Sequence, residues 1–303
     1  MIPAVRIADA RSFLFVPGSR PDRFAKAQNS HADIVILDLE DAVAPQDKSD
    51  ARAAVVGWLA KHPAVVRINA VGTPWHQEDL AALNAAEHLL GVMLPKAESS
   101  DEVYATSVAL HGVPLLALVE TAKGIRDAAQ VAETVGVVRL AFGSYDFCRD
   151  AGVTNSSGDE RELLLARSTL VIASRAAGLP GPVDGVQGDI ADESGLLAST
   201  RRAADLGFTA KLCIHPAQLH SVHEALRPGE EELAWARRVL QVAGDSAGAA
   251  VRVDGQMIDK PRLDLARRLL ALDRAHNRDD GAEQTTAPAQ QTHGDKTSSG
   301  DAM

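Results

Sequence analysis

Eight short apolar runs recur along the chain, and each is followed by a longer stretch rich in Ala and Leu with helical spacing. The interiors of the runs are continuously apolar, which is typical of parallel strands covered on both faces. Eight strand-and-helix units over about 220 residues predict an α/β fold, a (β/α)8 TIM barrel with a C-terminal helical extension; an open doubly wound sheet is the weaker alternative. The runs are SFLFVPG (12–18), DIVILDLED (33–41), VVRINA (65–70), GVMLPKAE (91–98), PLLALVET (114–121), VVRLAFGSYD (137–146), GPVDGV (181–186) and FTAKLCIHP (208–216).

The chain changes character after the eighth unit. An amphipathic helix is expected from about Glu230 to Val242, and a turn at Asp254-Gly255 and a helix start at Pro261 precede another helix. The last residues are rich in Gly, Ser, Thr and Gln and poor in bulky apolar residues, as disordered tails are. The predicted parts are a barrel over 1–229, a helical extension or lid over 230–276 and a disordered tail over 277–303.

Charge and composition narrow the class of protein. Among 303 residues, Lys and Arg number 31 and Asp and Glu 41, and this net charge of −10 argues against unaided binding to nucleic acid or anionic membrane. The longest apolar stretch, 113–119, is far shorter than the roughly 20 residues that span a bilayer. Cys148 and Cys213 are too few for a disulfide framework. We therefore expect a cytoplasmic protein with reduced thiols.

Charged and turn-forming residues end nearly every apolar run. In a TIM barrel the carboxyl ends of all strands gather at one mouth, where the active site lies. Residues far apart in the sequence are thus expected to converge there. These residues are Asp38 to Asp41, Arg67, Asn69, Lys96, Glu98, Glu120, Asp146, Asp184, Lys211 and His215.

Glu120 and Asp146 carry the strongest signal for chemistry, because each ends an apolar run, LALVE and RLAFGSYD. A carboxylate at the buried end of a strand is costly without a partner. Two such acids on neighbouring strands predict a site for a hard cation. No His or Cys sits at a comparable strand end near either acid, which favours Mg²⁺ over zinc. The alternative is that each acid caps a helix or pairs with a loop cation.

Arg67 brings a guanidinium to the end of the third run, where it could bind a substrate carboxylate through two hydrogen bonds. The alternative is an internal pair with Asp38 or Glu40. Strand alternation puts Asp38 and Glu40 on one face and Asp41 on the other. We expect these acids to orient Arg67 and the water around a bound cation, although a purely structural role is equally compatible with the pattern.

The first run leads into a Gly-Ser-Arg turn with a helix start at Pro21 and the cations Arg20, Arg23 and Lys26. A helix N-terminus with adjacent cations attracts phosphates, which the nucleotide end of coenzyme A would supply. Surface Arg and Lys residues are also often simply solvated. His215 stands alone before a proline, which favours a structural role.

Nine motifs in order carry a resemblance over roughly residues 11–272: RSFLFVPGSRPDRFAKA, ADIVILDLEDAV, VRIN, LPKAE, LLALVETAKG, GSYDF, GPVDGV, KLCIHP and GQMIDKP. Together they resemble the HpcH/HpaI aldolase and citrate lyase superfamily, and most of all its CitE-like branch of citrate lyase beta subunits and malyl- and citramalyl-CoA lyases. The related pyruvate aldolases use a histidine shortly after the second strand. DLEDAVAPQDK has none, which favours the CoA branch.

The resemblance implies a Mg²⁺-dependent barrel, commonly trimeric, that makes or breaks a carbon–carbon bond between an acyl-CoA enolate and a 2-oxo acid. It also implies that Asp259 in GQMIDKP reaches into a neighbouring subunit's mouth as general acid/base. The departure at Tyr145, where relatives vary, affects the expected pocket shape. The site prediction is Glu120 and Asp146 for the metal; Asp259, Arg67, Glu40 and Asp41 for catalysis; Arg67, Glu120 and Asp38 for substrate; and Arg20 and Lys26 for the CoA phosphates.

The expected function is cleavage of a 3-hydroxy-carboxyacyl-CoA of the citryl-, malyl- or citramalyl-CoA type to an acyl-CoA and a 2-oxo acid. Two alternatives stay open. One is a non-catalytic or carrier-dependent subunit of a citrate lyase complex. The other is a malyl-CoA thioesterase or malate-synthase-like enzyme, in which hydrolysis is coupled to the same enolate chemistry.

Overall fold

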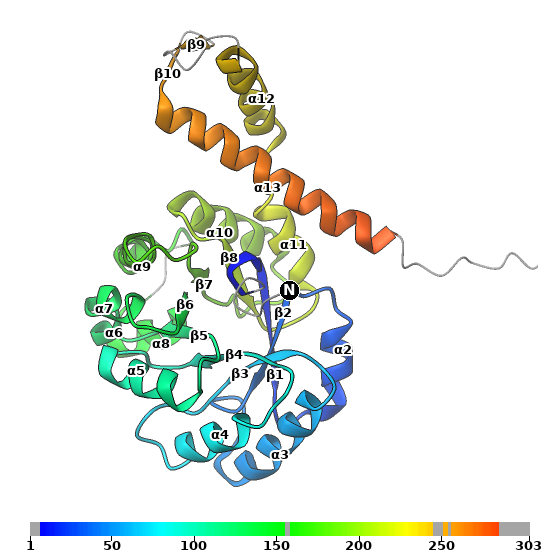
Figure 1. The fold of residues 1–303 in the computed structure, drawn as a ribbon, viewed down its shortest axis with the longest axis vertical. Coiled ribbons are helices and arrows are strands. Elements are labelled where there is room, and N and C mark those ends of the chain that lie inside the picture. The colour runs from blue at the N-terminus through cyan, green and yellow to red at the C-terminus, as the bar shows by residue number, and fades with distance from the viewer. Residues whose placement is uncertain (1–6, 155–157, 245–250, 254–255, 285–303) are drawn as a thin grey trace, which may run out of the picture. The chain divides into compact units, whose positions relative to one another are not determined.

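Eight parallel strands close into a barrel in chain order, and β8 pairs back with β1 (Figure 1). The apolar and β-branched side chains of the runs suit strands that are buried on both faces. Each predicted run overlaps one strand, although β3 and β4 begin one and two residues before their runs. The predicted (β/α)8 TIM barrel is confirmed. The strands are β1 (Ser12–Pro17), β2 (Ile34–Asp38), β3 (Ala64–Arg67), β4 (Leu89–Leu94), β5 (Leu115–Val119), β6 (Val137–Phe142), β7 (Val183–Asp184) and β8 (Ala210–Cys213).

The computed structural model describes residues 7–154, 158–244, 251–253 and 256–284. The chain divides into two compact units, Met1–Leu226 and Arg227–Met303. The first unit holds the barrel, and the second holds the last helices of the chain. The division that the sequence suggested, at residues 229 and 276, stays a prediction.

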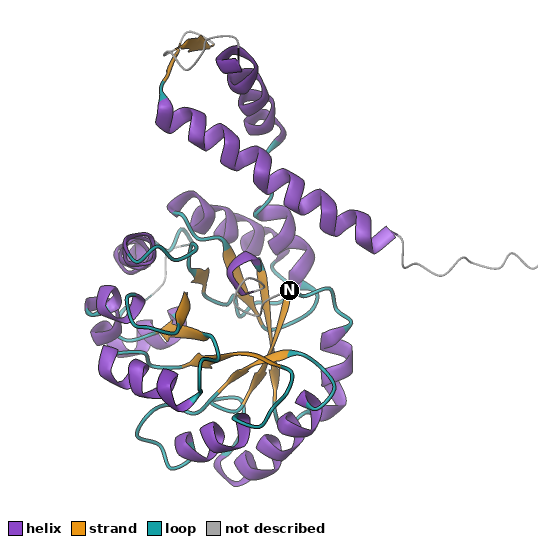
Figure 2. Ribbon diagram, viewed as in Figure 1, coloured by secondary structure: helices purple, strands orange, loops and turns teal. Residues whose placement is uncertain are grey.

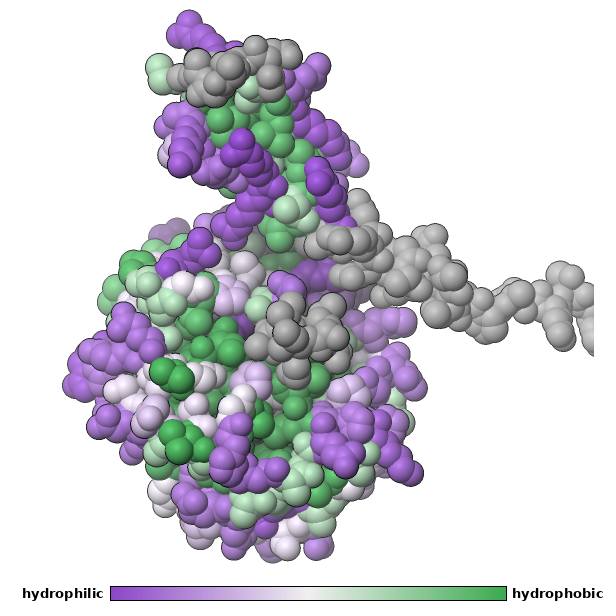
Figure 3. All heavy atoms as spheres, in the orientation of Figure 1, coloured by the Kyte–Doolittle hydropathy of each residue, from purple (hydrophilic) through white to green (hydrophobic). Residues whose placement is uncertain are grey.

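Helices form an outer layer around the strands of the first unit (Figure 2). Hydrophilic side chains gather around the rim of this unit, and more of the apolar surface lies towards its centre (Figure 3). The helices of this unit are η1 (Pro21–Arg23), α2 (Phe24–Gln28), η2 (Pro45–Asp47), α3 (Lys48–Leu59), α4 (His76–Leu83), α5 (Ser100–Ala109), α6 (Ala122–Arg126), α7 (Ala128–Ala132), α8 (Ser144–Ala151), η3 (Arg161–Leu163), α9 (Leu164–Ala176), α10 (Glu193–Leu206) and α11 (Gln218–Ala225).

The strands separate two apolar clusters. The larger cluster fills the space between the sheet and the helices, and it includes Val66 and Val119. The smaller cluster fills the barrel interior, and it includes Val65, Leu116 and Leu118. Because side chains alternate along a strand, this division shows which residues of each strand point into the barrel.

Arg139 closes the end of the barrel opposite the mouth. Its buried guanidinium donates to the carbonyl oxygens of Ile7, Ala10 and Gly181 at 2.7–3.0 Å and to the hydroxyl of Thr209 at 2.7 Å. Burial lowers the pKa of Arg139 to about 9. These bonds tie the segment before β1 to the amino ends of the strands, so the mouth is the end left for a ligand.

The second unit contains α12 (Glu230–Gly244), the short antiparallel pair β9 (Val251–Val253) and β10 (Gln256–Ile258), and α13 (Lys260–Gln284). Its small core includes Ala236, Val239 and Ile258. The sequence predicted both helices and missed the strand pair, and the turn predicted at Asp254-Gly255 lies outside the described residues. None of the helices in the described part of the chain is long and apolar enough to cross a membrane.

Helix α13 continues to Gln284, beyond Asn277, where the sequence predicted that order ends. Extending an existing helix by one residue costs far less than starting a new one. Arg278, Ala282 and Glu283 are good helix formers, which favours this extension despite the polar composition. The predicted tail over 277–303 stays a prediction.

Candidate active site

Glu120 directly follows β5 and points into the mouth. Leu116 and Leu118 belong to the interior cluster, so alternation directs Glu120 to the same side. The side chain is 2% exposed, and its Oε1 accepts a hydrogen bond from the backbone N–H of Lys96 at 2.9 Å. Gly143, at the end of the neighbouring strand β6, leaves the room that this carboxylate fills.

Asp146 lies in the first turn of α8, three residues beyond Gly143, rather than at the end of a strand. A carboxylate is favoured at this position by the partial positive charge of the helix N-terminus. Its side chain is 21% exposed and forms an ion pair with Arg149 one turn further on. The sequence-based alternative of a salt-bridge partner therefore describes Asp146 in part, although an exposed pair of this kind is weak and exchangeable.

Glu120, Asp146 and Arg67 line one cavity of about 70 Å³ in the barrel mouth. Phe15 and Tyr145 complete part of the wall. The hydroxyl of Tyr145 accepts a hydrogen bond from the backbone N–H of Gly188 at 3.0 Å, which holds the ring at the edge of the cavity. The remaining lining residues are Leu118, Phe142, Gly143, Ser144, Val186 and Leu212.

Arg67 ends β3 and forms the internal pair that the sequence left as an alternative. Its Nε lies 2.7 Å from Oδ1 of Asp38 and its Nη2 lies 2.6 Å from Oδ2, a two-bond contact between neighbouring strand ends. The guanidinium also stacks over the ring of Phe15, 4.8 Å from its centre. This contact uses one edge of the guanidinium, and the Nη1–Nη2 edge is the one not occupied by Asp38.

Glu40 lies between two cations. Its Oε2 is 3.1 Å from Nη1 of Arg67, and its Oε1 accepts a hydrogen bond from Nζ of Lys96 at 2.6 Å. Burial raises the pKa of Glu40, while the charges of Arg67 and Lys96 act in the opposite direction. Asp38 and Glu40 are both buried at the mouth and Asp41 is exposed, which is the distribution expected from alternation.

The acids of the mouth repel one another. Burial, followed by the charges of Glu40 and Asp146, raises the pKa of Glu120 to about 8. A divalent cation between Glu120 and Asp146 would relieve this repulsion, so the two residues fit such an ion. Among the described residues no three His, Cys, Asp or Glu side chains form a ready metal cage. Water and substrate oxygens would therefore complete the shell, as is common for Mg²⁺.

The residues predicted for the CoA phosphates lie beyond the end of β1. Arg20 is exposed and donates to Asp22 at 2.7 and 2.9 Å, and Lys26 is an exposed residue of α2. The predicted helix start is seen at Pro21, where η1 begins. Their role toward CoA stays a prediction.

Asp259 belongs to the second unit. It immediately precedes α13, and its Oδ1 accepts a hydrogen bond from the backbone N–H of Arg262 at 3.3 Å. A side-chain acceptor before the first turn is the usual way to satisfy the free N–H groups there. The structure thus gives Asp259 a capping contact, and its catalytic role stays a prediction.

Asp184 and Lys211 do not lie in the mouth, contrary to the expectation from their strand ends. Their neighbours Val183, Ala210 and Leu212 face the barrel interior, so alternation turns Asp184 and Lys211 toward the helices. Nζ of Lys211 lies 2.7 Å from Oδ2 of Asp184. Arg167 of α9 completes this buried network, with its Nε 2.9 Å from Oδ1 of Asp184.

His215 is exposed, and its Nδ1 accepts a hydrogen bond from the backbone N–H of Ala217 at 3.2 Å, just before α11. This contact agrees with the structural reading of the sequence. Lys48 is a residue that sequence reasoning missed. It is buried, and its Nζ donates to the carbonyl oxygens of Leu39 and Glu40, each at 2.7 Å. No sequence motif identifies a lysine ten residues after a strand as the residue that donates hydrogen bonds to the carbonyl oxygens just beyond that strand.

Comparison with known proteins assigns the chain to a family. The sequence profile of HpcH/HpaI aldolase/citrate lyase matches residues 11–216. A citrate lyase subunit beta-like protein of Mycobacterium tuberculosis is 42% identical over 263 residues, covering 85% of this chain and 93% of the relative. The chain belongs to the HpcH/HpaI aldolase/citrate lyase family. The family resemblance predicted from the motifs is confirmed, and so is the prediction of an enzyme of the lyase class.

Family members with related names and structures are similar over nearly their whole length. A (3S)-malyl-CoA thioesterase of Cereibacter sphaeroides is 33% identical over 270 residues, covering 86% of this chain and 93% of the relative. A crystal structure of CitE from Mycobacterium tuberculosis in complex with magnesium, acetoacetate and coenzyme A has a TM-score of 0.80 and 40% identity. The match covers 88% of this chain and 99% of CitE.

Proposed function

We propose that this chain is a Mg²⁺-dependent lyase that cleaves a 3-hydroxy-carboxyacyl-CoA, of the citryl-, malyl- or citramalyl-CoA type, to an acyl-CoA and a 2-oxo acid. One observation carries the proposal: Glu120, Asp146 and Arg67 line the same cavity of the barrel mouth. Two carboxylates suit a hard cation, and a guanidinium suits the carboxylate of an oxo acid. The complex of CitE with magnesium, acetoacetate and coenzyme A supports this substrate class.

Glu120 and Asp146 are the proposed metal ligands. Glu120 is buried and positioned by the backbone of Lys96, so it is the more rigid of the two. Asp146 would exchange its exposed partner Arg149 for the cation. When bound there, Mg²⁺ would supply Lewis acidity toward the hydroxyl and carboxylate oxygens of the substrate.

Arg67 is the proposed binding residue for the substrate carboxylate. Asp38 holds its Nε and Nη2, and Phe15 supports its plane, so the guanidinium is positioned before substrate arrives. A substrate carboxylate would take the remaining Nη1–Nη2 edge from Glu40, whose Oε2 lies 3.1 Å from Nη1. Glu40 and Asp41 are proposed to orient Arg67 and the water of the site.

The bond cleavage requires two proton movements. The 3-hydroxyl proton passes to a water molecule of the site, the adjacent carbon–carbon bond breaks to form the oxo acid, and the electron pair of that bond passes into the thioester enolate. Asp259 of a neighbouring subunit is proposed to protonate the enolate carbon as general acid. This role requires an oligomer, for which we propose a homotrimer.

Arg20 and Lys26 are proposed to bind the phosphates of CoA. Both are exposed cations close to the Gly-Ser-Arg turn after β1. Arg20 would exchange its two hydrogen bonds to Asp22 for the same two-bond contact with a phosphate, which carries more negative charge. A cytoplasmic location stays a prediction from the sequence.

A panel of citryl-, malyl- and citramalyl-CoA, assayed with Mg²⁺ and with excess EDTA, tests the proposed function. The release of 2-oxo acid is followed through a coupled dehydrogenase. We expect Mg²⁺-dependent release from at least one thioester. Absence of cleavage across the panel by folded protein would contradict the proposal and favour a carrier-dependent subunit.

Hydrolysis is a second candidate, because a (3S)-malyl-CoA thioesterase is among the similar proteins. The two reactions differ in their products. A lyase yields acyl-CoA and oxo acid, whereas a thioesterase yields free CoA thiol and the intact hydroxy acid. Measuring free thiol in the same assays separates them.

A further inference from the structure

Lys96 lies at the acid cluster with a backbone conformation that is unusual for its residue type. It follows β4 and Pro95, and its φ of +49° falls in the left-handed region that favours glycine. Non-glycine residues in this region cost energy and are often found at functional sites. This conformation places the backbone N–H and the side chain of one residue on the same group of carboxylates.

Both parts of Lys96 contact the acids of the mouth. The backbone N–H donates to Oε1 of Glu120 at 2.9 Å, and Nζ lies 2.6 Å from Oε1 of Glu40. Nζ is also 4.0 Å from Oε1 of Glu120. The two carboxylates are nearly inaccessible, whereas the Lys96 side chain is 35% exposed.

We propose that the Lys96 ammonium competes with the divalent cation for the negative charge of Glu40 and Glu120, and thereby sets the metal affinity of the site. This inference rests on the proposed function, because it assumes that Glu120 is a metal ligand. In the free protein, Lys96 compensates the charge that the metal would otherwise compensate. When the metal binds, the Lys96 head moves toward solvent.

Lys96 suits this role better than Arg67. Acids hold the guanidinium of Arg67 on two sides: Nε and Nη2 are bonded to Asp38, and Nη1 lies 3.1 Å from Oε2 of Glu40. Arg67 is only 12% exposed and cannot leave the cluster without burying its charge elsewhere. Lys96 carries a compact charge on a flexible chain with an exposed end, so its head can move while its backbone still holds Glu120.

Mg²⁺ titration calorimetry tests this inference without any substrate. The variants are Lys96→Met, which removes the charge and keeps the backbone bond to Glu120, and Lys96→Arg, which keeps the charge. Lys123→Met is the matched control, because Lys123 is an exposed lysine of α6 paired with Glu98. Circular dichroism and thermal unfolding establish that each variant is folded.

Lys96→Met is expected to bind Mg²⁺ at least about threefold more tightly than the wild type. The Mg²⁺ affinities of Lys96→Arg and Lys123→Met should be within about twofold of the wild-type affinity. A merely structural lysine would give the opposite direction, since its loss would loosen the site. Unchanged or weaker binding by folded Lys96→Met overturns the role of Lys96 and leaves the proposed function standing. Lack of Mg²⁺ binding by both the wild type and Lys96→Met overturns both.

Discussion

Gly143 leaves the space in which the side chain of Glu120 lies. A Cβ atom at residue 143 would be 2.4 Å from Oε2 and 2.5 Å from Cβ of Glu120, closer than real contacts allow. The φ of Gly143 is −92°, which any residue adopts, so the conflict is with the carboxylate and not with the backbone. The glycine of GSYDF is therefore needed so that the Glu120 side chain, at the end of the neighbouring strand β5, can take its place in the mouth.

Gly143→Ala is expected to displace Glu120 and to reduce Mg²⁺-dependent cleavage by about a hundredfold, because a shift of about 1 Å in a reacting group has effects of this size. Oxo-acid release and Mg²⁺ titration would measure both effects. Gly57→Ala is the control, since a Cβ there meets no atom within 4 Å. Equal activity of Gly143→Ala and the wild type would contradict the role given to Glu120.

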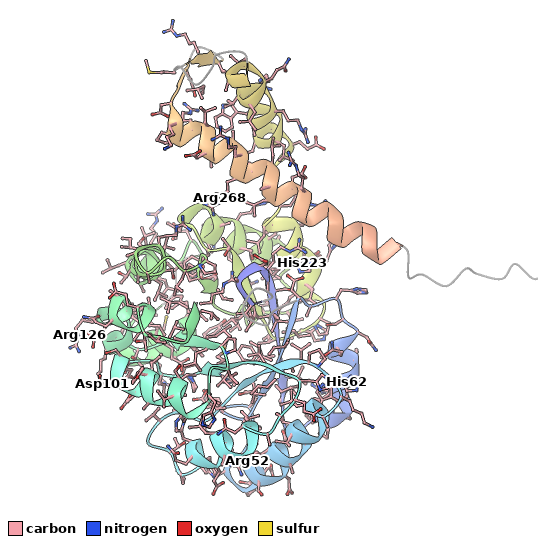
Figure 4. All side chains as sticks on the ribbon, in the orientation of Figure 1. Arg52, His62, Asp101, Arg126, His223 and Arg268 are labelled. Atoms are coloured by element: carbon pink, nitrogen blue, oxygen red, sulfur yellow. The ribbon has the colours of Figure 1, made fainter. Side chains whose placement is uncertain are left out.

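Arg67→Lys is expected to raise KM at least about tenfold with a smaller effect on kcat, because an ammonium cannot reproduce the two-bond contacts of a guanidinium. Steady-state kinetics would separate the two constants. Arg126→Lys is the control, because Arg126 lies on the outer helical layer (Figure 4) and its guanidinium pairs with the adjacent Asp127. A variant at residue 67 with unchanged KM would show that Arg67 serves the fold alone.

Asp184→Asn is expected to lower the free energy of unfolding by ~3–5 kcal/mol at pH 7, because Lys211 would lose its buried acid and Arg167 would keep only its ion pair with Glu160. Both cations are nearly inaccessible, at 2% and 7% of their side-chain surface. Urea unfolding measures the change. Asp101→Asn is the control, since Asp101 is exposed on α5 (Figure 4) and should change stability little.

The stability difference between wild type and Asp184→Asn should depend on pH. Burial alone would raise the pKa of Asp184, but the charges of Lys211 and Arg167 outweigh it and hold that pKa below its usual value. A group with a lowered folded pKa contributes stability above its unfolded pKa, at about pH 4, and loses it as pH falls further. The difference should therefore be full at pH 7 and shrink below pH 4. A stability difference that grows as the pH falls would contradict a lowered pKa of Asp184 in the folded protein.

The sequence predicts the barrel well because the runs and helical stretches are short, regular and separated by turn residues. It also predicts that Asp38 and Glu40 share a face and that Glu120 enters the mouth. The prediction that Asp184 and Lys211 lie in the mouth is wrong. Runs that are apolar on both faces contain no alternation, so they do not show which residues point inward. Strand β7 has only the residues Val183 and Asp184. A shift of its register by one residue would therefore exchange the residue that points into the barrel with the one that points to the helices.

The finer geometry of the site depends on contacts between distant segments, which the sequence leaves open. The sequence predicts that Arg67 binds substrate and leaves an internal pair as the alternative. The register of β2 against β3 pairs Arg67 with Asp38. Lys96 is visible as a charged residue after a strand, but its positive φ and its two contacts are tertiary properties. The strand pair β9–β10 is too short for its pattern to differ from a loop.

Titration calorimetry of Mg²⁺ binding to Glu120→Gln, Asp146→Asn and the wild type decides whether these two carboxylates hold the cation. Each substitution removes one carboxylate charge and keeps the size of the side chain. We expect the wild type to bind Mg²⁺ and each variant, still folded, to lose at least about tenfold in affinity together with Mg²⁺-dependent cleavage. Wild-type affinity and cleavage in both variants would show that the cation, or the chemistry, lies elsewhere.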